Sequence, residues 1–132
     1  MQGTLKLLAL GGYHTNGGQL IEVNSNGENG TCSVLPEIPE FMSGSVAAIT
    51  RQGDEILICG GYETRKCYSF RPTNGEWVQK GSLDYQRHGA ALVDLGSNGY
   101  LVTGGEDEDQ DPTQLNSSIY FKGFKDKYTG HL

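Results

Sequence analysis

Long apolar runs are missing from this chain: no stretch approaches the roughly 20 residues that span a bilayer, so we expect no membrane partner. Basic residues are few, with 10 Lys and Arg against 16 Asp and Glu. No basic face is visible, which argues against nucleic acid as a partner. The run Leu5–Leu10 is interrupted by Lys6 and falls short of the roughly 7–15 apolar residues of a signal peptide core. We therefore interpret it as a strand, and the compartment, cytoplasmic or secreted, stays open.

Cysteine and histidine are also scarce, and neither shows a ligand pattern. The 3 Cys lack the two-pair spacing of zinc sites, and the 3 His, at positions 14, 88 and 131, are scattered. The acidic run from Glu106 to Asp111 lacks the sixth-position Gly and the distal Glu of an EF-hand loop. No nucleophile with an adjacent base can be assembled. We expect no metal, no cofactor and no catalytic residue.

Glycine, in contrast, is abundant, with 20 residues among 132, which is typical of many tight turns between short strands. Three Gly-Gly pairs stand out, and their first residues are 49 and 44 positions apart. A short apolar run precedes each pair: Leu5–Leu10, Ile56–Cys59 and Tyr100–Thr103. The pairs themselves are Gly11-Gly12, Gly60-Gly61 and Gly104-Gly105.

Each pair is followed by the same order of features. A polar stretch leads to a second predicted strand, at 20–23, 67–70 and 118–121, and then to a turn signal such as Asn26-Gly27 or Asn74-Gly75. A further strand is predicted at 31–34, at 76–79 and, more weakly, at 126–129. With no helical period, this pattern predicts antiparallel four-stranded meanders.

These repeats, with their Gly-Gly pairs and Trp77, resemble the Kelch repeat of β-propellers, which is roughly 50 residues long. The resemblance implies an all-β fold of Kelch-type blades in an incomplete propeller of two to three blades. Residues 1–39 would form a blade without its inner strand, 40–83 a complete blade, and 84–132 a third blade with an acidic loop insertion. Ser43-Gly44 departs from the family pattern, which usually has Arg at the first of these positions.

The resemblance also assigns structural roles. The six glycines of the pairs would lie where a strand leaves its sheet, Trp77 and Tyr68 would wedge between blades, and Arg87 would brace the neighbouring repeat. Cys59 and Cys67 flank a seven-residue connection between antiparallel strands, so they either form a disulfide or remain buried free thiols. Some Kelch-like chains contain Cys-Gly-Gly followed by a strand with Cys-Tyr, and this chain has the same pattern at Cys59-Gly60-Gly61 and Cys67-Tyr68.

Loops on one rim of a Kelch propeller usually meet protein partners, and loops on a rigid scaffold suit binding. We expect a non-catalytic protein-interaction module or scaffold, whose partner the sequence does not identify. The candidate contacts are Tyr13, His14, Tyr62, Arg65, Glu106, Asp107, Glu108, Asp109 and Asp111. The alternatives are a fragment of a larger Kelch protein, such as a ubiquitin-ligase substrate adaptor or an actin binder, and a Kelch-type oxidase or epimerase.

Two further expectations follow. About three blades are too few to close a propeller, which typically has about 4–8. The chain would therefore belong to a longer protein or would self-associate to complete a ring. N-glycosylation sequons begin at Asn29 and Asn116, close to the number expected by chance, so they leave the compartment open.

Overall fold

The computed structural model describes residues 4–27, 30–50, 54–122 and 126–131, the last of these by backbone alone. The described chain contains β-strands and one short 3-10 helix but no α-helix, which confirms the predicted all-β class. No helix among the described residues is long and apolar enough to cross a membrane.

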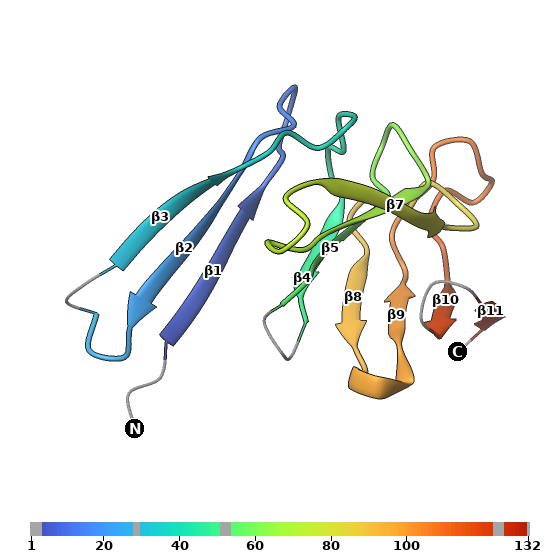
Figure 1. Cartoon of the computed structure of the whole chain (residues 1–132). Coiled ribbons are helices and arrows are strands. Elements are labelled where there is room, and N and C mark those ends of the chain that lie inside the picture. The colour runs from blue at the N-terminus through green and yellow to red at the C-terminus, as the bar shows by residue number, and fades with distance from the viewer. Residues whose placement is uncertain (1–3, 28–29, 51–53, 123–125, 132) are drawn as a thin grey trace.

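The strands form three antiparallel sheets in chain order (Figure 1). The first sheet contains β1 (Thr4–Leu10), β2 (Gly18–Asn24) and β3 (Gly30–Leu35). The second contains β4 (Val46–Ile49), β5 (Ile56–Cys59), β6 (Lys66–Phe70) and β7 (Trp77–Ser82). The third contains β8 (Ala91–Asp94), β9 (Tyr100–Thr103), β10 (Ser117–Lys122) and β11 (Asp126–His131), with the 3-10 helix Gly96–Asn98 between β8 and β9.

The last strand is longer than the sequence predicts. Only a weak strand is expected at 126–129, whereas β11 pairs with β10 along its whole length, from Asp126 opposite Lys122 to His131 opposite Ser117. Pairing depends on backbone N–H and C=O groups, so a strand of low apolar content can still complete a sheet.

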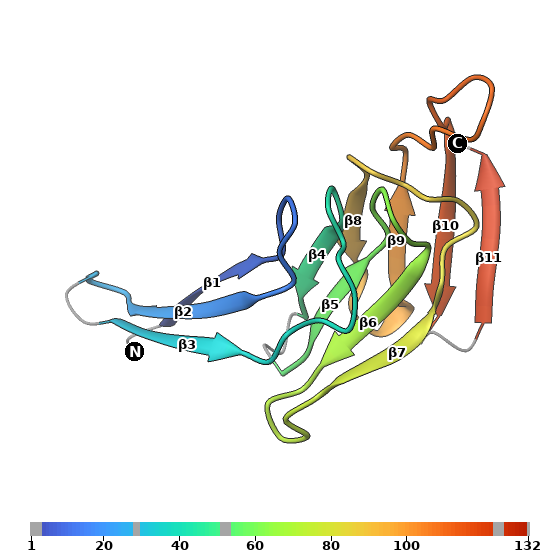
Figure 2. The same ribbon diagram turned by 90° about the horizontal axis from the view of Figure 1, so that it is seen from above.

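The second sheet lies between the other two (Figure 2). Because successive side chains of a strand point to opposite faces, β5 is buried on both sides. Leu57 and Cys59 pack with Val102, Ile119 and Phe121 of the third sheet. The opposite face, formed by residues such as Ile56, packs against the first sheet. Burying both faces of the central sheet removes apolar surface from water and so stabilises the fold.

Trp77 and Tyr68 lie on the face of the second sheet that meets the first. Trp77 packs against Phe70 with ring centroids 5.4 Å apart, and its Nε1 donates to the Pro36 carbonyl at 2.7 Å. The Tyr68 hydroxyl donates to Glu40 at 2.6 Å. Burial and the Glu40 carboxylate raise the pKa of Tyr68 to about 12. Both rings therefore attach the second sheet to the connection between β3 and β4.

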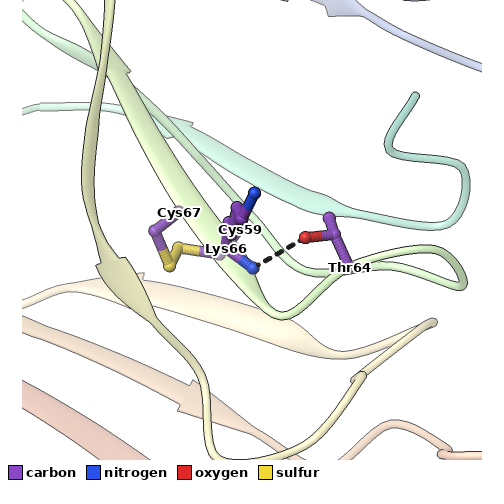
Figure 3. The surroundings of a disulfide bond; sticks show 4 residues. All are labelled: Cys59, Thr64, Lys66 and Cys67. Atoms are coloured by element: carbon purple, nitrogen blue, oxygen red, sulfur yellow. Dashed lines mark hydrogen bonds between the residues drawn. A yellow bond between two sulfur atoms is a disulfide. The ribbon is translucent and has the colours of Figure 1, made fainter. Parts of the chain in front are cut away.

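A disulfide joins Cys59 at the end of β5 to Cys67 in β6 (Figure 3). The two residues are directly opposite in the strand register. Between them, the buried Thr64 hydroxyl accepts a hydrogen bond from the Lys66 N–H at 3.0 Å, just where β6 begins. Cys32 is exposed and unpaired.

The second glycine of a Gly-Gly pair permits a close backbone approach. A Cβ at Gly61 would lie 2.5 Å from the Ser43 carbonyl oxygen, and one at Gly105 would lie 2.9 Å from that of His88. Both glycines also have positive φ, at 120° and 86°. In the second and third sheets, the pairs therefore let the preceding connection lie against the loop that follows β5 or β9.

Arg87 is completely buried in the connection between β7 and β8. Its guanidinium donates to both carboxylate oxygens of Asp84, at 3.0 and 3.1 Å. It also donates to the Gly104 carbonyl and to the carbonyl and hydroxyl of Ser117, at 2.7–2.9 Å. The expectation that Arg87 braces the neighbouring repeat needs correction, because these partners lie in its own connection and in the third sheet that follows it.

We predict that Arg87→Met lowers the free energy of unfolding by about 3–5 kcal/mol, because it removes the charged partner of the Asp84 carboxylate and the guanidinium donor to the Gly104 carbonyl. The control is Lys6→Met. Lys6 pairs with Glu22 at 3.3 Å and both side chains are more than a third exposed, so its loss should cost less than about 1 kcal/mol. Urea unfolding measures both, and equal losses would contradict the structural role given to Arg87.

Candidate functional site

Several connections gather along one edge of the three sheets, here called the rim (Figure 1). They are the β1–β2 loop (11–17), the β3–β4 connection (36–45), the β5–β6 loop (60–65), the β7–β8 connection (83–90) and the β9–β10 loop (104–116). Loops presented by rigid strands are a common basis for binding. The rim also holds every candidate contact predicted from the sequence.

Hydrogen bonds at Ser43 connect the rim from the first sheet to the second. The Ser43 hydroxyl donates to the Gly12 carbonyl at 3.2 Å, and its carbonyl accepts from the Tyr62 N–H at 2.9 Å. The Glu63 carboxylate accepts from the Ser43 N–H at 2.9 Å. Toward the third sheet, the Gly89 N–H donates to the Gly44 carbonyl at 3.1 Å. The rim is therefore one connected surface.

Tyr13, His14 and Phe41 form an exposed aromatic group at the end of the rim nearest the first sheet. The His14 ring lies 4.0 Å from the Tyr13 ring and 6.4 Å from the Phe41 ring, measured between centroids. Tyr13 is 85% exposed and Phe41 is 47% exposed. Exposed aromatic rings on hydrogen-bonded loops are typical of contact residues in protein interfaces.

Tyr62 and His88 form a second ring pair, where the second and third sheets meet. The rings stack with centroids 3.8 Å apart and an interplanar angle of 13°. A Cβ on Gly44 would lie 3.0 Å from the Tyr62 ring and 3.1 Å from the His88 Cβ, so glycine leaves room for this stack. Tyr62 is 51% exposed, whereas His88 is 8% exposed. The stack presents one face of Tyr62 to solvent and fixes the imidazole beneath it.

The acidic loop does not expose all of its carboxylates. Asp107 is 5% exposed, and its carboxylate accepts hydrogen bonds from the Gln86 N–H at 3.2 Å and the Asp109 N–H at 3.0 Å. The expectation that Asp107 contacts a partner therefore needs correction, because its charge is used to hold the loop against the β7–β8 connection. Asp109 and Asp111 are exposed.

Glu106 and Glu108 lie on either side of Asp107 and turn toward His88. The His88 Nε2 lies 3.2 Å from Glu108 Oε1 and 4.0 Å from Glu106 Oε2. The sequence predicts no metal site, yet one nitrogen and two carboxylate oxygens come within 4.8 Å of one another here. This cluster of His88, Glu106 and Glu108 is named the His–Glu cluster.

Arg65 takes another position. Its guanidinium donates to the Asp84 carbonyl at 3.4 Å, so Arg65 lies against the β7–β8 connection.

An open hollow of about 480 Å³ lies farther along the β9–β10 loop and is lined by residues that include Tyr85, Asp111 and Asn116. Asn116, the start of one sequon, is exposed, whereas Asn29 lies outside the described residues. The candidate contacts thus occupy one rim without forming a single pocket.

A second hollow, of about 310 Å³, lies at the opposite edge and includes Asp54, Glu55, Arg71 and Tyr100. Arg71 is paired with Glu55. Burial, followed by the nearby Glu55, Asp94 and Asp54 carboxylates, raises the pKa of Tyr100 to about 12. The phenol therefore stays neutral at ordinary pH, and this hollow shows no charge arrangement that selects a ligand.

Two site residues were missed from the sequence, His88 and Phe41. The scattered positions of the three histidines give no sign that His88 belongs to a site. A signal was present, however, because Glu106 follows its Gly-Gly pair where Tyr13 and Tyr62 follow theirs. Glu106 thus replaces the tyrosine of the other two repeats, and the antiparallel bridge between His88 and Glu106 places its carboxylate opposite the imidazole.

No protein-family model matches the chain, and no curated protein matches it. The solved structure of YjhT is similar, with a TM-score of 0.58 and 17% sequence identity. The match covers 86% of this chain and 38% of the YjhT chain, so this chain spans well under half the length of YjhT. At this identity the likeness shows a shared fold and says nothing of activity.

We predict that Asp107→Asn destabilises the protein by about 1–3 kcal/mol, because an amide NH₂ would face one of two backbone donors. The neighbouring exposed residue gives the control, Asp109→Asn, with a change within about 0.5 kcal/mol. Thermal or urea unfolding measures both variants. If the two variants have the same stability, Asp107 does not hold the loop.

Proposed function

We propose that this chain is part of a Kelch-type β-propeller that binds a protein partner through the rim, without catalysis. The observation that carries the proposal is the exposure of Tyr13, Phe41 and Tyr62 on loops tied together by backbone hydrogen bonds. Rigid aromatic side chains lose little conformational entropy on binding, so they suit an interface. Exposed acidic side chains beside them favour a partner with a basic surface.

The arrangement of the sheets supports the propeller part of the proposal. Three antiparallel meanders follow one another in the chain, and β4 lies beside both β1 and β8. The likeness to YjhT extends over most of the chain. Both observations agree with consecutive blades around a common axis.

The first sheet supports the idea of further strands. By their Gly-Gly pairs, β1, β5 and β9 are equivalent, and β5 and β9 each pair with an inner strand, β4 or β8. Among the described residues, no strand pairs with the corresponding edge of β1, and Leu5 and Leu7 are about half exposed. We propose that a further strand of a longer Kelch protein covers this edge. A second copy of the chain is the alternative source.

The interaction role is tested by weakening the aromatic end of the rim. A partner is isolated by affinity capture with the intact protein, and its Kd is then measured against purified variants. We predict that Tyr13→Ser weakens binding roughly 30-fold, the effect of losing about 2 kcal/mol at an interface hot spot. Asp109→Asn combined with Asp111→Asn should weaken binding less and should reduce its dependence on salt.

Val93→Ser is the control, because Val93 is 43% exposed near the end of β8 that leads away from the rim loops. It removes an exposed apolar side chain just as Tyr13→Ser does, and it should leave Kd unchanged. If Val93→Ser weakens binding and Tyr13→Ser does not, the partner uses another surface and the rim proposal fails.

A further inference from the structure

The His–Glu cluster is built on a fixed piece of backbone. His88 and Glu106 are directly opposite in an isolated antiparallel bridge, with N–H···O distances of 3.1 and 2.9 Å in the two directions. Opposite residues of an antiparallel pair present their side chains to the same side. Glu108 follows two residues later, and Asp107 between the two glutamates anchors the loop through the Gln86 N–H. The three side chains therefore meet because of the backbone that carries them.

The imidazole is the rigid member of the cluster. His88 is buried beneath Tyr62, which stacks on its ring, and its Nε2 is directed at the two carboxylates. Glu106 and Glu108 have room to reorient, since their side chains are 42% and 64% exposed. A fixed nitrogen with two adjustable oxygens is suited to closing around an ion, because only the exposed side chains need to move.

We infer that the His–Glu cluster binds a divalent cation of the zinc class. Zinc takes imidazole nitrogen and carboxylate oxygen at about 2.0–2.2 Å, so two ligand atoms of a tetrahedral site are about 3.3 Å apart. The His88–Glu108 pair is already at 3.2 Å, and the His88–Glu106 pair at 4.0 Å closes with a small rotation of an exposed side chain. Two carboxylates with a neutral imidazole also balance a charge of about +2.

The donor set selects the class of cation. Calcium takes about 6–8 oxygen ligands, and magnesium keeps several waters around one or two carboxylates. A nitrogen ligand with two oxygens suits zinc and its first-row neighbours better. Three protein ligands leave one position open to water or to a group of the partner. A bound ion would join the β7–β8 connection to the acidic loop, and it would lie on the rim beside Tyr62.

The site is tested with the full chain, freed of metal by a chelator and titrated with Zn²⁺ alone by calorimetry, and with Co²⁺ alone by visible absorption. We expect one equivalent of Zn²⁺ and the absorption bands of Co²⁺ bound to nitrogen and oxygen. Glu108→Gln should weaken Zn²⁺ binding by at least about tenfold. Removing a residue that only hydrogen-bonds to a metal ligand already lowers metal affinity by about 10–100-fold, and removing a ligand should cost no less. His88→Gln should abolish binding.

Two controls keep the test specific. His14→Gln removes an exposed histidine of the same rim, and Asp109→Asn removes an exposed carboxylate of the same loop; both should bind Zn²⁺ as the wild type does. Because Glu108 is largely exposed, its variant should fold even if His88→Gln does not. Failure to saturate at one equivalent, or equal affinity in Glu108→Gln and wild type, overturns the site. Saturation by Ca²⁺ with no effect of Co²⁺ overturns the zinc class.

Discussion

The buried guanidinium of Arg87 is the interaction on which the rim depends. It binds Asp84 within its own connection and, at the same time, the carbonyl groups at the end of β9 and the start of β10. Burying a charge requires such complete pairing, so the connection has one stable position. His88 is the next residue, and its bridge to Glu106 and its stack on Tyr62 follow from that position.

The second sheet has a related arrangement with uncharged residues. Met42 and Ser43 occupy the positions of Arg87 and His88, because the Ser43 carbonyl accepts from the Tyr62 N–H as the His88 carbonyl accepts from the Glu106 N–H. Glu63 accepts the Ser43 N–H, whereas Asp107 accepts that of Gln86. The carboxylates are equivalent, since each is the second residue after its Gly-Gly pair. The absence of a side chain at Gly44 leaves space that Tyr62 fills. The same backbone pairing between a loop and the preceding connection therefore carries an aromatic surface near the first two sheets and an acidic surface at the third.

The sequence was sufficient for the strands but not for the loops. Gly-Gly pairs and alternating apolar runs predicted the meanders because both are local signals, set by turn geometry and by the period of a strand. The inward turn of Asp107 could not be predicted, because it depends on the Gln86 N–H from another loop. The convergence of His88 with Glu108 likewise depends on a turn inside a variable insertion. The partners of Arg87 are long-range, and the repeat pattern does not identify them.

Hydrogen–deuterium exchange of Arg87→Lys tests most directly whether this guanidinium positions the rim. Lysine keeps the charge but loses the planar set of donors, so it cannot satisfy Asp84 and both carbonyl groups together. Faster exchange should be confined to residues 84–90 and 104–117, including the His88 and Glu106 amides, while β2 and β5 exchange as in the wild type. Unchanged exchange at these amides, or an equal increase in all three sheets, would contradict the account.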